Sequence, residues 1–264
     1  MSRINRTFDR LKKKGQSALI PFIMAGDPDI KATEALVLKM AEAGADIIEL
    51  GVPFSDPTAD GPTIQAASQR AQQNGVDLKE ILQLAERLRG VNTPLVLMTY
   101  YNPVFRYGLK DFAESCGRSG VVGVIIPDLP PEEAGPWIGE ARKMSLDTIF
   151  FIAPTSPPDR ISLVSRYSRG FIYYVSVTGV TGARENLPDE LGPAVKRIKE
   201  QSKKRVAVGF GISTPEQAKK IGLFADGVIV GSAIVKMIEE NLRHPELAGK
   251  VKDFVSSFSE ALKS

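Results

Sequence analysis

The chain has 264 residues, of which 43% are hydrophobic and 25% are charged. This composition is ordinary for a folded globular protein and excludes collagen-like, low-complexity and wholly disordered chains. Lys and Arg number 34 against 31 Asp and Glu, so the formal net charge of +3 indicates neither nucleic acid nor a membrane as partner.

The first predicted element is an amphipathic helix, in which Ile4, Phe8 and Leu11 recur at helical spacing. The basic residues around them and the apolar run 18–25 together resemble the start of a secretory signal peptide. A proline interrupts the run, and a Gly-Asp-Pro turn at 26–28 ends it, so we interpret the run as a buried strand. No run is long enough to span a bilayer.

Short apolar runs alternate with amphipathic stretches through the rest of the chain. Strands are predicted over residues 18–24, 46–50, 95–100, 121–126, 148–152, 171–175, 206–210 and 227–230. Helices are predicted over residues 31–43, 63–73, 78–88, 109–116, 132–144, 160–166, 190–201, 215–221, 233–240 and 247–262. The basic run 199–205 is interpreted as the solvated end of a helix.

Strands that are apolar on both faces and separated by helices indicate a parallel sheet covered on both sides. Eight of them, each followed by a helix, predict an α/β fold of the (β/α)₈ TIM-barrel type. We expect a single domain, residues 1–264, with an extra N-terminal helix. An open, doubly wound sheet is the structural alternative.

The second predicted strand carries a carboxylate at the end where such barrels form their sites. Side chains alternate along a strand, so if Ile48 and Leu50 face the helices, Ile47 and Glu49 point into the barrel. Apolar surroundings raise the pKa of a carboxyl group, which suits a proton donor near neutral pH. The alternative is a structural glutamate paired with an inward-facing lysine.

Asp56 and Asp60 follow in a loop rich in proline and glycine. Loop aspartates usually form turns or cap helices, and Asp60 directly precedes Gly61-Pro62 and a predicted helix. Taken alone, the local sequence favours a turn-forming or helix-capping role for both aspartates. If Asp60 shares a pocket with Glu49, however, the two carboxylates supply an acid and a base in different environments.

Two glycine turns near the C-terminus predict a phosphate site. Gly209-Phe210-Gly211 follows the seventh strand, and Gly231-Ser232 follows the eighth and opens a helix. Backbone N–H groups at helix N-termini bind anions, and these two loops are the usual phosphate site of the barrel. The third glycine of a dinucleotide fingerprint is missing. After the sixth strand, a loop rich in Thr and Gly is a candidate to close over a ligand.

The counts of cysteine and histidine limit the kinds of disulfide, metal site and catalytic site that the chain can form. The one cysteine, Cys116, cannot form an internal disulfide, so we expect a reducing, cytoplasmic location. The one histidine, His244, stands in a polar stretch after a predicted helix, where we expect it to be solvated. Zinc sites built from several His and Cys are excluded by this count. Acid–base chemistry must then use carboxylates, Lys or Tyr, and we expect no metal.

The stretch 48–62, IELGVPFSDPTADGP, closely resembles the signature of the tryptophan synthase α chain family. Further matches in family order lie at 21–22, 26–28, 100–103, 127–130, 179–182, 209–213 and 231–233. The resemblance therefore covers essentially the whole chain. Thr58 stands where an aliphatic residue is usual, and we expect this difference to alter loop packing rather than chemistry.

This resemblance implies a barrel enzyme, a lyase of tryptophan biosynthesis, that cleaves indole-3-glycerol phosphate to indole and glyceraldehyde 3-phosphate. Glu49 and Asp60 match the two catalytic carboxylates, Glu49 as proton donor and shuttle and Asp60 as base toward the indole N–H. Tyr173 matches a tyrosine close to the reacting glycerol, and Thr181 matches a threonine of a closing loop.

The remaining implied contacts are with substrate and partner. The phosphate-binding positions of the family are matched by Gly182, Gly211, Gly231 and Ser232. Its indole pocket is matched by Phe22, Tyr100, Ile125 and Phe151. Phe210 is a further implied substrate contact. The family implies an α2β2 assembly with a β chain, which receives the indole and holds the pyridoxal phosphate. No cofactor is expected in this chain.

Two other functions are compatible with the residues. One is a phosphate-binding barrel isomerase or epimerase, although the single histidine counts against the metal ligands that such epimerases usually use. The other is a binding module that holds an indole-like or phosphorylated ligand and regulates a partner without catalysis.

Overall fold

The strands close into a barrel in chain order, and every neighbouring pair is parallel. The computed structural model describes residues 1–175, 188–209 and 211–264. The strands are β1 (Ala18–Met24), β2 (Ile48–Gly51), β3 (Leu95–Met98), β4 (Val121–Ile125), β5 (Asp147–Ile152), β6 (Ile172–Val175), β7 (Val206–Gly209) and β8 (Gly227–Val230). The predicted (β/α)₈ barrel is confirmed, and the open sheet is wrong.

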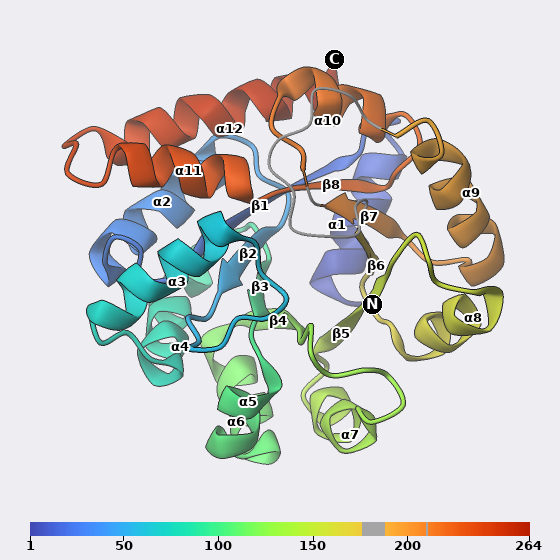
Figure 1. Ribbon diagram of the computed structural model, residues 1–264, viewed down its shortest axis with the longest axis horizontal. Coiled ribbons are helices and arrows are strands. Elements are labelled where there is room, and N and C mark those ends of the chain that lie inside the picture. Colours follow the sequence, from blue (N-terminus) through green and yellow to red (C-terminus); the bar gives the residue numbers. More distant parts are fainter. Residues whose placement is uncertain (176–187, 210) are drawn as a thin grey trace.

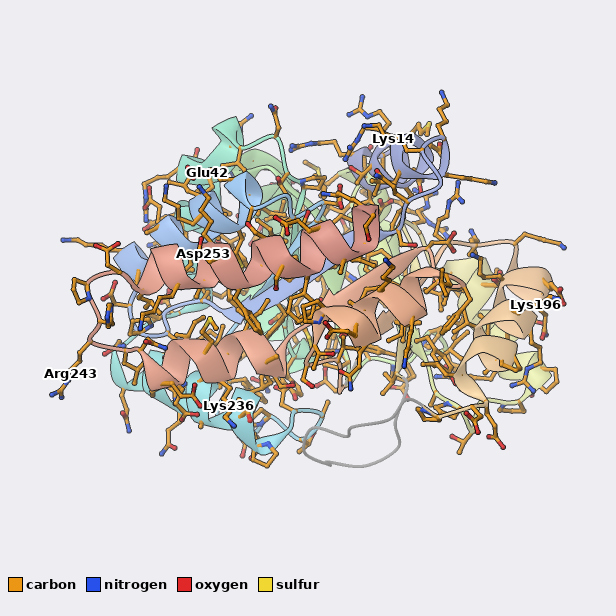
Figure 2. All side chains as sticks on the ribbon, turned by 90° about the horizontal axis from the view of Figure 1, so that it is seen from above. Lys14, Glu42, Lys196, Lys236, Arg243 and Asp253 are labelled. Atoms are coloured by element: carbon orange, nitrogen blue, oxygen red, sulfur yellow. The ribbon has the colours of Figure 1, made fainter. Side chains whose placement is uncertain are left out.

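Helices surround this barrel on its outer side, except for α1, which lies at one end of it (Figure 1). They are α1 (Arg3–Lys12), α2 (Ile30–Glu42), α3 (Pro62–Gln73), α4 (Leu78–Arg87), α5 (Tyr101–Tyr107), α6 (Leu109–Ser119), α7 (Gly135–Lys143), α8 (Pro158–Tyr167), α9 (Leu191–Ser202), α10 (Pro215–Gly222), α11 (Ser232–Glu240) and α12 (Leu247–Lys263). Charged side chains project from them into solvent, as Figure 2 shows for Lys196 on α9 and Lys236 on α11.

Two element boundaries and one missed helix differ from the predictions for clear physical reasons. The helix expected from residue 132 begins at Gly135, because the backbone N–H groups of Glu133 and Ala134 donate to Pro130 in a separate turn. The second strand begins at Ile48 rather than at 46, where the Asp46 carboxylate accepts from Leu19 N. The short helix α5 was not predicted, since seven residues give too little apolar periodicity.

Strand alternation divides the apolar side chains between two layers. Ile48 and Leu50 belong to the large cluster between strands and helices, whereas Ile47 belongs to the cluster inside the barrel. Tyr174 likewise faces the helices and Tyr173 the interior. The prediction that Glu49 points into the barrel therefore rests on an alternation that the neighbouring residues confirm.

Helix α1 covers the N-terminal end of the barrel. Its residues Ile4, Phe8 and Leu11 are buried in the inner cluster, and the Phe8 ring meets Phe171 edge-on at 5.9 Å between centroids. The Ser2 hydroxyl caps the helix by accepting from Asn5 N. The predicted amphipathic helix is confirmed, and it leaves the opposite end of the barrel for a site. Among the described residues, no helix has the length and apolarity needed to cross a membrane.

Candidate active site

Glu49 lies inside the barrel on β2, beside Phe22 of β1 and Val96 of β3. Its side chain is 1% exposed, and within the described part of the chain neither carboxylate oxygen has a hydrogen-bond partner. Burial, and secondarily the charge of Asp60, raises the pKa of Glu49 to about 8. The alternative of a glutamate paired with an inward lysine is wrong, since no described cation contacts it. A protonated carboxylic acid therefore stands free inside the barrel at neutral pH.

Asp60 lies on the segment between β2 and α3 and is 8% exposed. The Tyr100 hydroxyl donates to its Oδ2 at 3.1 Å, and the same hydroxyl accepts from Ala59 N at 2.9 Å. Burial raises the pKa of Asp60 to about 6, although the Tyr100 hydrogen bond opposes the increase. Asp60 is therefore ionised at neutral pH, whereas Glu49 is not.

The helix-cap reading of Asp60 is wrong. The N-cap residue of α3 is Gly61, and no side chain caps this helix; Pro62 in its first turn removes one of the donors that a cap would satisfy. The Asp60 carboxylate instead meets Tyr100. Asp56 remains an exposed loop residue that accepts from the Ser55 hydroxyl at 2.6 Å.

Tyr173 brings a phenol to the same end of the barrel. It is 5% exposed, and its ring lies 4.7 Å from that of Phe151 between centroids. Burial and the charges of Glu49 and Asp60 raise the pKa of the Tyr173 hydroxyl well above its usual value. A Cβ added to Gly209 would lie 2.6 Å from the Tyr173 hydroxyl oxygen, so the tyrosine occupies space that only glycine leaves open.

Aromatic and aliphatic side chains form the walls around these polar groups. Phe22 is 5% exposed and lies over Gly51, where an added Cβ would come within 2.6 Å of its ring. Ile125 is fully buried inside the barrel, and Phe151 is half-buried beside Tyr173. These predicted indole-pocket residues thus lie on β1, β4 and β5, whereas Glu49 and Tyr173 lie on β2 and β6 of the same barrel.

Tyr100 has a role that sequence reasoning missed. We predicted it only as a wall of the indole pocket, but its hydroxyl also holds Asp60. Its ring stacks on Phe54 of the carboxylate loop, 5.1 Å between centroids. The aromatic pair therefore fixes the loop as well as the aspartate. Nothing in the residue pattern alone placed Tyr100, the residue that caps the start of α5 just after β3, beside that loop.

The predicted phosphate positions lie partly within the described residues. Gly231 is the N-cap of α11 and makes no side-chain cap, and Ser232 is exposed at the first position of the helix. Gly211 follows β7 with φ +78°. A helix N-terminus with free N–H groups fits a phosphate. Thr181, Gly182 and Phe210 lie outside the described residues.

The described residues hold no group of three or more His, Cys, Asp or Glu that could bind a metal. His244 is exposed, as predicted, and its Nδ1 accepts from Glu246 N at 3.0 Å. Cys116 is buried, and burial raises the pKa of its thiol.

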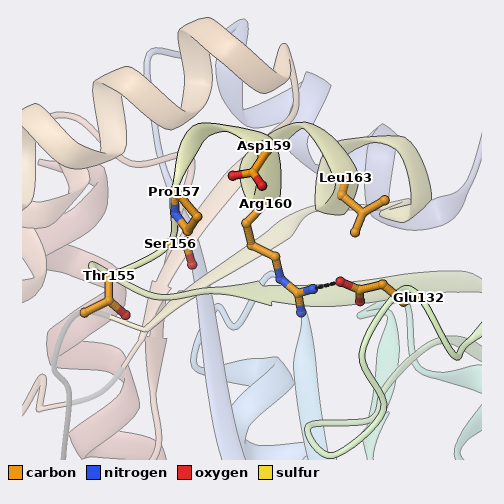
Figure 3. A pocket seen from close by; sticks show the side chains of 7 residues that line it. All are labelled: Glu132, Thr155, Ser156, Pro157, Asp159, Arg160 and Leu163. Atoms are coloured by element: carbon orange, nitrogen blue, oxygen red, sulfur yellow. Dashed lines mark hydrogen bonds and ion pairs between the residues drawn. The ribbon is translucent and has the colours of Figure 1, made fainter.

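A pocket of about 400 Å³ lies at the start of α8, separate from Glu49 and Asp60 (Figure 3). Thr155, Ser156 and Pro157 form one wall, and an ion pair between Arg160 and Glu132 crosses it. None of the side chains predicted to do chemistry lines this pocket.

Comparisons with known proteins agree on one family. The family model described as tryptophan synthase alpha chain matches residues 8–263. The chain is 52% identical to the tryptophan synthase alpha chain of Geobacter sulfurreducens, with 99% of both chains covered. Among solved structures, it is similar to Mycobacterium tuberculosis tryptophan synthase (38% identity, TM-score 0.92, covering 100% of this chain and 99% of that one). It is also similar to subunit alpha from Legionella pneumophila (37% identity, TM-score 0.92, covering 99% and 98%).

Proposed function

The chain belongs to the tryptophan synthase alpha chain family, and from that premise we propose that Glu49 and Asp60 are the acid and base of its reaction. That reaction is the lyase step in which indole-3-glycerol phosphate is cleaved to indole and glyceraldehyde 3-phosphate. Membership of this family excludes the alternative of a phosphate-binding isomerase or epimerase.

The cleavage is a retro-aldol step with three proton demands. The ring carbon that holds the glycerol must gain a proton, and the ring N–H needs an acceptor while positive charge develops on the indole. The glycerol hydroxyl must lose its proton as its carbon becomes the aldehyde. Glu49 gives its proton to the ring carbon, and the resulting carboxylate takes the hydroxyl proton when the carbon–carbon bond breaks. Glu49 thus ends the cycle protonated, as it began.

Asp60 is the acceptor for the ring N–H. Its ionised carboxylate stabilises the positive charge that forms once the ring carbon is protonated. The Tyr100 hydroxyl holds one of its oxygens, so the carboxylate keeps its direction toward the interior.

The observation that carries this assignment is that both carboxyl groups are buried at one end of the barrel, where burial raises the pKa of Glu49 to about 8 and that of Asp60 to about 6. At pH 7, between these values, Glu49 retains its proton and Asp60 has lost its own. Two carboxyl groups with opposite protonation states at one end of a barrel are what acid–base catalysis needs.

The remaining site residues are assigned by position. Tyr173, whose ring packs against Phe151 and whose pKa is raised by the charges of Glu49 and Asp60 as well as by burial, contacts the glycerol part of the substrate. Gly182, Gly211, Gly231 and Ser232 bind the phosphate, and Thr181 closes over the ligand. The indole ring lies among Phe22, Tyr100, Ile125, Phe151 and Phe210.

The chain works with a tryptophan synthase beta chain, and structures similar to it are of tryptophan synthase. We further propose an α2β2 assembly in the cytoplasm, in which the beta chain alone holds pyridoxal phosphate and receives the indole. Each residue assigned above acts without a cofactor in this chain.

Indole release from indole-3-glycerol phosphate by the purified chain tests this proposal. We expect release without added pyridoxal phosphate or metal, and faster release when a beta chain is added, because partner binding favours the closed site. Substrate binding without indole release under either condition would instead support the binding-module function.

A further inference from the structure

Helix α3 begins directly after the loop that carries Asp60, and one of its faces is turned back toward that loop. This polar face consists of Gln65, Ser68 and Gln72. The three residues are spaced by three and four positions, so their side chains lie next to one another on the helix surface. All three bind backbone groups of residues 54–60, which ties the loop to the helix that follows it.

The Ser68 hydroxyl holds the start of the loop. Ser68 is 1% exposed, and its hydroxyl accepts from Phe54 N at 2.9 Å and donates to Phe54 O at 3.0 Å. The side-chain amide of Gln72 donates to the same carbonyl oxygen at 2.8 Å. Both backbone groups of Phe54 are therefore bound to α3. The Phe54 ring in turn stacks on Tyr100, whose hydroxyl binds the Asp60 carboxylate.

Gln65 holds the end of the loop at Asp60 itself. Its side-chain amide donates to the backbone oxygen of Asp60 at 2.9 Å and to that of Pro57 at 3.4 Å. The Asp60 backbone N–H donates to the same Pro57 oxygen at 3.0 Å. The turn from 57 to 60 is therefore closed both by its own backbone and by a side chain of α3.

Asp60 is thus held at two separate points. The Tyr100 hydroxyl binds its carboxylate, and Gln65 binds its main chain. Either contact alone would leave the residue free to turn about the other one. A carboxylate stabilises developing charge best when it is already in place, and an error of about 1 Å in the position of a catalytic group can cost about 10²-fold in rate.

We propose that Gln65 and Ser68 are positioning residues for the reaction: they hold the loop at its two ends and so set where the Asp60 carboxylate lies. This assignment rests on the proposed function, in which Asp60 is the base toward the indole N–H. Neither side chain transfers a proton or replaces that base. Their loss should lower kcat and leave KM close to the wild-type value, because the position of the carboxylate matters most as charge develops in the transition state.

Steady-state kinetics of indole release by the double variant Gln65→Met/Ser68→Ala test this inference. Methionine has nearly the length of glutamine but no hydrogen-bond donor, and alanine removes only the hydroxyl. We expect kcat to fall by about tenfold or more, since each lost hydrogen bond contributes about two- to tenfold, and KM to change by less than about twofold. Gln65→Met alone, at an exposed position, should keep the wild-type far-ultraviolet dichroism spectrum and lower kcat by about threefold. The matched control Gln69→Met replaces an exposed glutamine of the same helix and should leave both constants unchanged.

The same changes in an Asp60→Asn background distinguish positioning from a general effect on the fold. If the two residues act through Asp60, Gln65→Met/Ser68→Ala lowers kcat in that background by less than about twofold, because the carboxylate that they position is already gone. Equal losses in both backgrounds, or a wild-type kcat in Gln65→Met/Ser68→Ala, overturn the inference and leave Asp60 as the base. Full kcat in Asp60→Asn itself would refute the proposed base, and the inference with it.

Discussion

Replacing Glu49 by glutamine is expected to lower kcat for indole release by about 10²–10⁴-fold, the usual contribution of one general acid–base group. Glutamine keeps the shape of the side chain and cannot transfer the proton, so KM should remain close to the wild-type value. Steady-state kinetics with indole-3-glycerol phosphate measure both constants.

The matched control for this variant is Glu86→Gln, an exposed glutamate on α4. It removes the same charge at the surface and should leave kcat unchanged. The Glu49→Gln chain should also be at least as stable as the wild type at pH 8, because glutamine has no charge to bury. A kcat within about tenfold of the wild type would place the proton transfer elsewhere.

Asp60→Asn is the second large effect that we expect. Asparagine is similar in size and can still accept from the Tyr100 hydroxyl, but it carries no negative charge to stabilise the protonated indole ring. We expect kcat to fall by about 10²-fold or more, with a small change in KM, as for the loss of one preorganised electrostatic contact.

Two further variants distinguish the loss of the Asp60 charge from a disturbance of the loop that carries it. Asp56→Asn removes an exposed charge from the same loop and should retain activity. Tyr100→Phe removes the hydrogen bond that lowers the pKa of Asp60, so the acidic limb of the pH–rate profile should move to higher pH. If Asp60→Asn raised KM alone, with kcat intact, the aspartate would serve in binding rather than in charge stabilisation.

The barrel could be predicted from the sequence because its strands and helices leave clear patterns of apolar residues. Apolar strands such as 18–24 and 227–230 are buried on both faces, and the structure has them with the predicted bounds. Element ends were less predictable, since they depend on single hydrogen bonds such as that between Asp46 and Leu19 N. The single-domain organisation stays a prediction.

The site was predictable to the extent that it depends on strand alternation. The two-residue period of β2 is enough to send Glu49 inward. Asp60 was ambiguous from local pattern alone, because a loop aspartate before Gly-Pro is typical of a helix cap. Its actual partner, Tyr100, lies 40 residues away at the start of α5, and contacts at that separation have no local signal.

The protonation state of Glu49 tests the central claim most directly. Difference infrared spectroscopy can follow the C=O band of a protonated carboxylic acid with pH, and the band of Glu49 is identified by its loss in Glu49→Gln. Because burial raises the pKa of Glu49 to about 8, we predict that the band persists through neutral pH and disappears with a midpoint near that value. A band already lost below pH 6 would mean that Glu49 is ionised at neutral pH, which contradicts its role as the proton donor.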